Sequence, residues 1–378
     1  MIVSNGEKKL PQWIRGFIRN SLLSSCIIAL PVHADIYFST KVGGPIVNIH
    51  SVNEQGDITK ITDNKRWRDV EHSVSVDGLI SFSSNRRDVK VTLKNRAPEN
   101  FNIYILDPLN NKLEQVTKQA AQELQPQFSP SGKQLAFIRS EKDKQSLIIY
   151  DLKSKKEKVL STSKVIFDFY WSPNSQQLAF TSQTKKSAAM SVINIENLNN
   201  EIILTTGFNE KSKRLKNLFL GVSWSPDGNN IAYIHHPFTE GISRTLHIYN
   251  IKNKNEHLIS QPEIQVQSPI TWSNNSKTLL YAALVDYKYY FDESIHKKVY
   301  LGGMHIFHSD LAGNSKQLTR GDHLFKHPIY SPKQDKIAYL YANKLDSKTL
   351  SLKTINIDGS NEKTLSNKVF QRANLHWQ

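Results

Sequence analysis

The feature that most constrains the fold is a sequence phrase that recurs along the chain. It begins with a bulky residue, which in most copies is followed by Ser-Pro. Two or three polar residues and a short apolar stretch complete it, as in WSPDGNNIAYIHH (224–236). The leading residues of its copies are Val74, Phe128, Trp171, Trp224, Trp272 and Tyr330, followed by a final Trp377. They are spaced 43 to 58 residues apart, which fits propeller blades of about 40–50 residues that carry insertions.

Each period predicts four short strands. After Phe128 the chain reads LAFIRS, SLIIYDL and KVLST, which are apolar runs rich in β-forming residues and separated by turn residues. No segment keeps a helical periodicity over three turns, which excludes a helical solenoid. We therefore expect an all-β chain of four-stranded antiparallel blades.

The two ends of the chain determine the blade count. DIYFST, PIVNIHSV and DITKIT near the N-terminus supply three strands that lack a first strand, and ANLHWQ at the C-terminus supplies a first strand alone. The sequence thus predicts a seven-bladed β-propeller over residues 35–378. Its ring would close by pairing of the N-terminal strands with the C-terminal strand, which leaves no open sheet edge. Six blades is the alternative.

The phrase WSPDG followed by IAY, with IYNI and LIS behind it, resembles the repeats of TolB-like β-propellers, which are WD-like. The resemblance covers essentially all of residues 35–378 and implies a propeller fold. We expect the chain to lack the N-terminal α/β domain of TolB itself, because predicted strands begin directly after the predicted leader.

Residues 1–34 are predicted to be a secretory signal peptide. A basic region precedes the apolar stretch SLLSSCIIALPV, and small residues lead to a cleavage site after Ala34. Lipidation at Cys26, the single cysteine, is the alternative. The mature chain has no second apolar stretch of spanning length, so we expect a periplasmic or secreted protein without a transmembrane segment.

The charge balance favours anionic partners. The formal net charge is +15, and removal of the leader, with four basic residues and one acidic residue, leaves +12. The basic residues are spread over predicted turns, as in KSKKEK (153–158), without the interleaved aromatics typical of nucleic-acid binding. We expect no nucleic-acid partner, whereas an anionic polysaccharide remains an option.

One face of the predicted ring carries the insertions, at residues 85–100, 206–217, 237–244 and 285–303. The first strand of each blade begins on that face, so polar residues three and five positions before each leading residue should ring the mouth of the channel. These candidate partner-binding residues are Asp69, Glu71, Glu123, Gln125, Asp168, Gln267, His327, Arg372 and Asn374. The alternative is that they only hydrate the channel and satisfy the strand ends.

The insertions also predict a recognition surface, because long connections on a rigid scaffold concentrate binding residues. Its candidate residues are Arg86, Arg87, Tyr287, Tyr289 and Tyr290. In the alternative, the aromatic residues fold back onto a neighbouring blade.

No catalytic residue, metal site or cofactor is predicted. The chain has no Gly-x-Ser-x-Gly elbow, phosphate loop or His-Glu-x-x-His run. His305 and His308 differ in strand parity, although HLFKHPIYSP (323–332) faintly resembles metal-dependent propeller lyases that cleave pectic oligosaccharides.

Whether the chain is an enzyme is left open, and the lack of a motif favours a binding role. We expect a module that binds an envelope protein or peptide through its loop-rich face. The alternatives are a polysaccharide-active enzyme that resembles a metal-dependent oligosaccharide lyase, and an anionic-glycan-binding protein.

Overall fold

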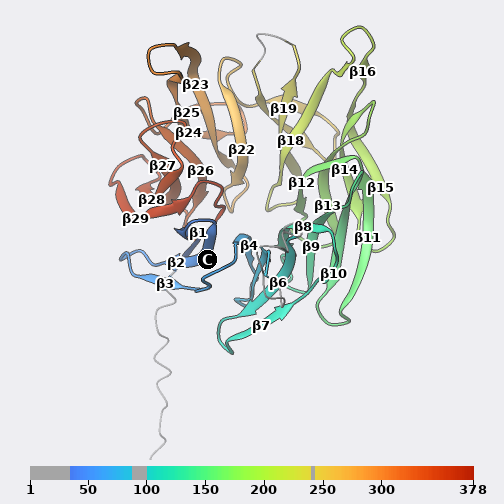
Figure 1. Cartoon of the computed structure of the whole chain (residues 1–378). Coiled ribbons are helices and arrows are strands. Elements are labelled where there is room, and N and C mark those ends of the chain that lie inside the picture. The colour runs from blue at the N-terminus through green and yellow to red at the C-terminus, as the bar shows by residue number, and fades with distance from the viewer. Residues whose placement is uncertain (1–34, 87–99, 240–242) are drawn as a thin grey trace, which may run out of the picture. The chain divides into compact units, whose positions relative to one another are not determined.

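The computed structural model describes residues 35–86, 100–239 and 243–378, which belong to one compact unit, Ala34–Gln378. Every regular element in these ranges is a β-strand (Figure 1). The prediction of an all-β chain is confirmed. Within the same ranges, no helix is long and apolar enough to cross a membrane. The predicted signal peptide, 1–34, lies outside the described residues.

Within the described residues, four separate antiparallel sheets hold four strands each. The first contains β4 (Asp69–Val74), β5 (Ile80–Ser84), β6 (Asn102–Asp107) and β7 (Lys112–Gln115). The second contains β8 (Gln122–Phe128), β9 (Gln134–Ser140), β10 (Gln145–Asp151) and β11 (Lys156–Ser163). The third contains β12 (Val165–Trp171), β13 (Gln177–Gln183), β14 (Ala188–Asn194) and β15 (Asn200–Thr206). The fourth contains β18 (Asn217–Trp224), β19 (Asn230–Pro237), β20 (Thr245–Asn250) and β21 (Glu256–Leu258).

The remaining strands form a small hairpin and one larger sheet of twelve strands. The hairpin consists of β16 (Phe208–Asn209) and β17 (Arg214–Leu215). The larger sheet begins with β22 (Gln265–Trp272), β23 (Thr278–Asp292), β24 (Lys297–Asp310) and β25 (Ser315–Gln317). It continues with β26 (Leu324–Tyr330), β27 (Lys336–Ala342), β28 (Thr349–Asn356) and β29 (Lys363–Phe370). Its last strands are β30 (Leu375–Trp377), β1 (Ile36–Gly43), β2 (Ile46–Val52) and β3 (Ile58–Lys60).

The first and last described strands meet in the larger sheet. Strand β30 pairs antiparallel with β1, so that Ile36 lies opposite Trp377. The groups of four strands in this sheet are joined only by single residue pairs, Met304 with Leu324 and Thr40 with Val369. The described sheets are therefore four-stranded meanders, of the kind found in β-propellers.

The recurring phrase has a local structural cause. Each leading residue is the last residue of a strand, as Trp224 is of β18. The serine that follows all but Trp377 accepts a hydrogen bond from the backbone N–H four or five residues later, as Ser225 does from Asn230 at 2.9 Å. The turn between them needs a positive φ, which Gly228 supplies at 78° without steric cost. The phrase thus encodes a hairpin turn between the first and second strands of a sheet.

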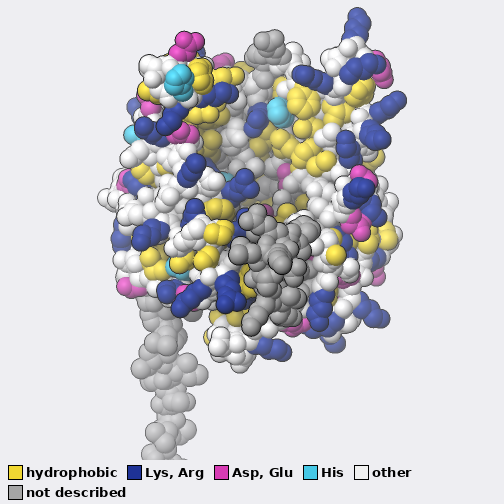
Figure 2. All heavy atoms as spheres, viewed as in Figure 1, with side chains coloured by type: hydrophobic (Ala, Val, Ile, Leu, Met, Phe, Trp, Pro, Cys, Tyr) yellow, Lys and Arg dark blue, Asp and Glu magenta, His cyan; other side chains and the backbone are white. Residues whose placement is uncertain are grey.

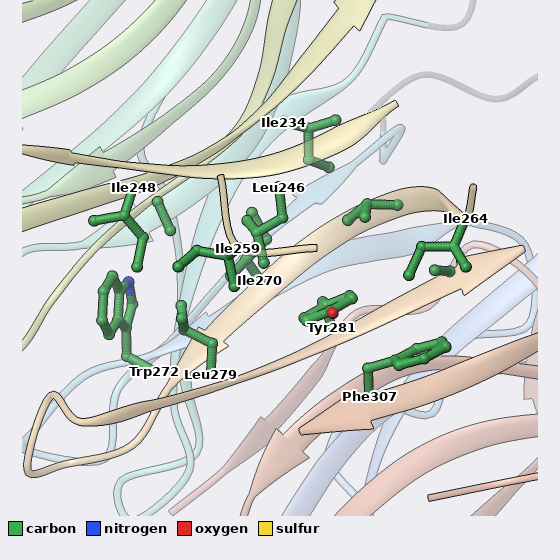
Figure 3. Close-up of a cluster of buried hydrophobic side chains, with 13 residues drawn as sticks. Ile234, Leu246, Ile248, Ile259, Ile264, Ile270, Trp272, Leu279, Tyr281 and Phe307 are labelled. Carbon is green, nitrogen blue, oxygen red and sulfur yellow. The ribbon is translucent and has the colours of Figure 1, made fainter. Parts of the chain in front are cut away.

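The core lies between neighbouring sheets. In one cluster, Leu246 and Ile248 of β20 pack against Trp272 of β22 and Tyr281 of β23 (Figure 3). The indole N–H of Trp272 donates to the carbonyl of Ser223, in the preceding sheet, at 3.0 Å. A tryptophan at this position therefore fills the space between two sheets and also satisfies its polar atom there.

Candidate binding face

We call β4, β8, β12, β18, β22, β26 and β30 the first strands, because each ends at a leading residue of the phrase. All but β30 contain a β-bulge a few residues before that end. The pairing register shifts between Val70 and Ser73, Leu124 and Gln127, Ile166 and Asp168, Leu220 and Ser223, Gln267 and Thr271, and Lys326 and Ile329. The position three residues before the leading residue falls in or beside this bulge.

The bulge places unusual backbone at the predicted mouth residues. Glu71, Gln125 and His327 have φ between 53° and 57°, which is uncommon for residues other than glycine. The same position holds Gly221 in the fourth sheet and Pro269 in β22. Glycine and proline inside a strand pattern are typical of bulges. These two residues are therefore the sequence signal from which the bulges could have been predicted.

Two carboxylates at this level bond the backbone of the next first strand. Glu71 accepts a hydrogen bond from the N–H of Gln125 at 2.8 Å. Asp168 accepts from the N–H groups of Gly221 at 2.8 Å and Val222 at 3.1 Å. These side chains bridge one sheet to the bulge of its neighbour. Burial raises the pKa of both carboxyls, and the hydrogen bonds from the neighbouring backbone oppose that rise.

The same link recurs with neutral groups at the other end of the chain. Nδ1 of His327 hydrogen-bonds with the carbonyl of Ala373 at 2.9 Å. The amide of Asn374 donates to the carbonyl of His72 at 2.5 Å. The predicted mouth residues thus include a set that joins a first strand to another first strand or to the residues just before β30.

Three of the polar residues five positions before a leading residue bond to an arginine side chain. Asp69 is fully buried and pairs with the guanidinium of Arg86. Glu123 is also fully buried and pairs with Arg139 at 2.6 Å. Gln267 accepts a hydrogen bond from the guanidinium of Arg244 at 3.1 Å.

The three arginines of the prediction, Arg372, Arg86 and Arg87, differ in their surroundings. Arg372 has an exposed side chain, and its charge acts on Glu71, lowering the pKa that burial raises. Arg86 is held by Asp69, and Arg87 lies outside the described residues. Arg372 is thus the exposed member of the channel-mouth set. Side-chain bonds to other parts of the fold are made by Asp69, Glu71, Glu123, Asp168, Gln267, His327 and Asn374.

We expect His327 to make the protein less stable in acid. Burial, with a smaller contribution from the charge of Lys326, lowers the pKa of His327 to about 4 from 6.5. Below pH 6.5 this histidine binds a proton in the unfolded chain but not in the folded chain. Its effect is therefore to lower the free energy of unfolding as the pH falls, by about 2 kcal/mol at pH 5. A His327→Asn variant, which tolerates the positive φ, should lose this dependence. Urea unfolding of both proteins from pH 7.5 to 5 tests it, and parallel profiles would contradict it.

The insertion at 285–303 is a strand pair rather than a loop. Strands β23 and β24 continue past the body of their sheet, pairing Tyr289 with Tyr300 and Asp292 with Lys297. We call residues 286–301 the aromatic arm. Likewise, the insertion at 206–217 contains the β16–β17 hairpin. The sequence showed the lengths of these insertions but not their strand pairing.

Apolar side chains lie exposed on both faces of the aromatic arm. Tyr289, Tyr290 and Phe291 are 58%, 49% and 57% exposed. Tyr289 and Phe291 point to one face of the ribbon and Tyr290 to the other, because side chains alternate along a strand. Figure 2 shows hydrophobic side chains at the surface in the region of β23. The arm's aromatic residues therefore do not all fold back onto a neighbouring sheet.

The base of the arm is held by close backbone contacts. Gly302 has a φ of 79°, and a Cβ at this position would lie 2.4 Å from the carbonyl oxygen of Val285. Only glycine fits here. A bulge between Val285 and Lys288 faces it on the partner strand. Glycine and bulge together set the direction in which the arm leaves the sheet.

The histidines singled out from the sequence do not converge. Nδ1 of His323 hydrogen-bonds with the carbonyl of Asn343 at 3.2 Å, and His327 is held by Ala373. His305 lies beside the ring of Phe325. Over residues 35–86, 100–239 and 243–378, no three or more His, Cys, Asp or Glu side chains gather in a group that could hold a metal ion.

Comparison with known proteins identifies the fold. No protein-family model matches the chain, and no curated protein matches it in sequence. TolB from Acinetobacter baumannii matches with a TM-score of 0.52 and 12% identity, over 90% of this chain and 82% of that one. An oligogalacturonate lyase in complex with manganese matches with a TM-score of 0.58 and 13% identity, over 82% of both chains.

A puromycin-hydrolyzing peptidase from Mycobacterium tuberculosis also matches, with a TM-score of 0.59 and 9% identity, over 89% of this chain and 54% of that one. At these identities the similarity concerns the fold alone. The chain has the fold of the TolB-like β-propeller proteins, as its repeats indicated, and the function has to be argued from its own surface.

Proposed function

We propose that this protein is an exported binding module that holds an envelope protein or peptide against the face carrying its long insertions. The observation that carries the proposal is the aromatic arm, 286–301, with exposed apolar side chains on both of its faces. Exposed aromatic residues on a rigid support are typical of recognition surfaces, because they bury a large area at a low cost in side-chain entropy.

We also propose that the propeller has seven blades. Three of them would make up the twelve-stranded sheet, as β22–β25, β26–β29, and β30 with β1–β3. The single residue pairs that join these groups support the division, and the pairing of Ile36 with Trp377 supports closure between the two ends of the chain. In this arrangement the aromatic arm and the β16–β17 hairpin lie on the same face as the starts of the first strands.

The location follows from the leader in this proposal. Cleavage after Ala34 would release residues 35–378 into the periplasm or the medium. A module with this role needs no cofactor, and its basic charge would favour acidic partners.

The binding role is tested by capture from the native cell envelope. Mature 35–378 should cross-link to a specific partner. A variant with Tyr289→Ser, Tyr290→Ser and Phe291→Ser should lose most of this capture, while its free energy of unfolding changes by less than about 1 kcal/mol because these side chains are exposed. The same partner captured equally by both proteins would contradict the role of the arm.

A matched control removes exposed apolar side chains elsewhere. Val76 and Leu109 are 65% and 89% exposed and lie in turns at the opposite ends of the strands from the arm. A Val76→Ser, Leu109→Ser variant should capture the partner as well as the unmodified protein does.

A polysaccharide-active enzyme is the second candidate, supported by the similarity in fold to the oligogalacturonate lyase. The described histidines do not fit the metal site that such a lyase would need, since His323 and His327 each hydrogen-bond with a backbone carbonyl and form no group. Incubation with pectic and uronic substrates and divalent metals tests this candidate. Unsaturated products absorbing in the ultraviolet would support an enzyme over the binding module.

A further inference from the structure

A cleft of about 380 Å³ lies beside the β16–β17 hairpin. Three segments line it: the turn after β13, the hairpin itself and the chain just after β19. The lining residues are Gln183, Lys185, Phe208, Lys213, Arg214, Leu215 and Phe238. Its volume is within the range of about 300–1,000 Å³ found for ligand sites.

The walls of the cleft are fixed by packing and backbone bonds. Leu215 is buried in a cluster with Ala188 and Leu218, and Phe208 packs against that cluster. The N–H of Phe238 donates to the carbonyl of Lys216 at 3.0 Å, which ties the chain after β19 to the hairpin. The cleft is therefore a formed feature of the fold rather than a gap between independent loops.

The lining combines an apolar surface with positive charge. Phe238 is 45% exposed, so it presents apolar area to a ligand. Lys185, Lys213 and Arg214 supply three cations, and no carboxylate is among the lining residues. Lys213 forms an ion pair with Glu210 at 3.6 Å, and because both side chains are largely exposed this pair is weak. Figure 2 shows Lys and Arg side chains next to hydrophobic ones in the region of β16.

This lining selects among ligand types. A neutral sugar needs acceptors as well as donors, yet Gln183 is the one neutral polar side chain of the lining. A polyuronate would meet the cations but would leave the aromatic surface of Phe208 and Phe238 unfilled. A large apolar side chain flanked by carboxylates would satisfy both parts of the cleft.

We infer that this cleft binds an acidic peptide segment through one large apolar side chain, with flanking Asp or Glu residues paired to Lys185, Lys213 and Arg214. The inference rests on the proposed function, since it names the chemistry of the peptide that this face would hold. It uses a site separate from the aromatic arm.

The probe is a fluorescein-labelled ten-residue peptide of Asp and Glu with one central Phe, titrated with mature 35–378 and followed by fluorescence anisotropy. We expect binding to weaken at least about tenfold when Asn and Gln replace the acids, or when Ser replaces the Phe. Binding should also weaken with added salt, since exposed charges are screened.

Variants locate the site. The Lys213→Gln, Arg214→Gln variant should lose at least about tenfold in affinity, and Phe238→Ser should lose several-fold. A Lys211→Gln, Lys252→Gln variant removes the same charge outside the cleft and should bind normally. Thermal unfolding of each variant checks that the fold is retained.

Several outcomes would overturn the inference. They are peptide binding that the cleft variants leave unchanged, the absence of peptide binding, and binding of polygalacturonate or anionic vesicles in place of the peptide. The arm variant Tyr289→Ser, Tyr290→Ser, Phe291→Ser separates this inference from the proposed function. It should bind the peptide normally, so a loss of envelope capture with peptide binding intact concerns the arm alone.

Discussion

Replacing Asp168 with alanine is expected to lower the free energy of unfolding by about 3–5 kcal/mol. The Asp168 carboxyl accepts hydrogen bonds from the backbone of Gly221 and Val222 and from the hydroxyl of Thr181, at 2.8 to 3.1 Å. The alanine variant would leave two backbone N–H groups at a bulge without their acceptor. An unmet buried donor costs more than the bond itself contributes, which is why the effect is large.

Urea unfolding at pH 7.5 measures this effect. Asp168→Asn should lose less stability than Asp168→Ala, because the amide oxygen still accepts from at least one N–H group. Asp143→Ala, at an exposed position, should change the free energy of unfolding by less than about 0.5 kcal/mol. A loss below about 1 kcal/mol in Asp168→Ala would show that this bridge between sheets contributes little.

The strands could be predicted from the sequence because the phrase repeats their physical requirements. The leading bulky residue fills the space between sheets, the serine satisfies a turn N–H, and a residue such as Gly228 permits the positive φ of the turn. These needs recur after Val74, Phe128, Trp171, Trp224, Trp272 and Tyr330, so they leave a periodic signal that a single chain displays.

The roles of the polar mouth residues could not be predicted in the same way. The sequence presents Glu71 and Asp168 only as acidic residues near the start of a strand. Their partners are backbone N–H groups of another sheet, about 54 residues away along the chain. A backbone partner carries no side-chain signature in a sequence. The bulge that turns those N–H groups toward the carboxylates is visible only indirectly, through Gly221 and Pro269 at the same position.

The secondary structure of the insertions could not be predicted from the sequence either. Aromatic residues at 287–291 are compatible with a packed loop or with a paired strand. The choice depends on whether 297–301 lies opposite them, which in turn depends on the backbone at Gly302. The cleft beside β16–β17 has the same origin, since it joins residues from three segments and no one segment predicts it.

The second large effect concerns Arg139. Its guanidinium pairs with the buried carboxylate of Glu123 at 2.6 Å and with Glu157 at 2.8 Å. Arg139→Met keeps an apolar stem over the ring of Phe137, which the guanidinium now covers at 5.6 Å. It leaves Glu123 buried without a counter-charge. We expect the free energy of unfolding to fall by about 3–5 kcal/mol at pH 7.5, as for other broken buried pairs.

Acid should relieve part of this loss. Burial raises the pKa of Glu123 from its ordinary 4.5, and the hydrogen bond and charge of Arg139 oppose that rise. Without Arg139 the folded-state pKa rises further, so the folded variant takes up a proton before the unfolded chain does. The deficit is then complete at neutral pH and shrinks as the pH falls toward 4.5.

The measurement is the difference in unfolding free energy between the unmodified protein and Arg139→Met, taken at each pH from 7.5 to 5. The difference cancels the other groups that titrate in both proteins, including His327. Lys155→Met breaks the largely exposed pair with Glu114 and should cost less than about 1 kcal/mol at every pH. A pH-independent deficit in Arg139→Met would mean that lost packing, rather than an unpaired carboxylate, explains it. Glu123 would then have to be held by its other neighbours.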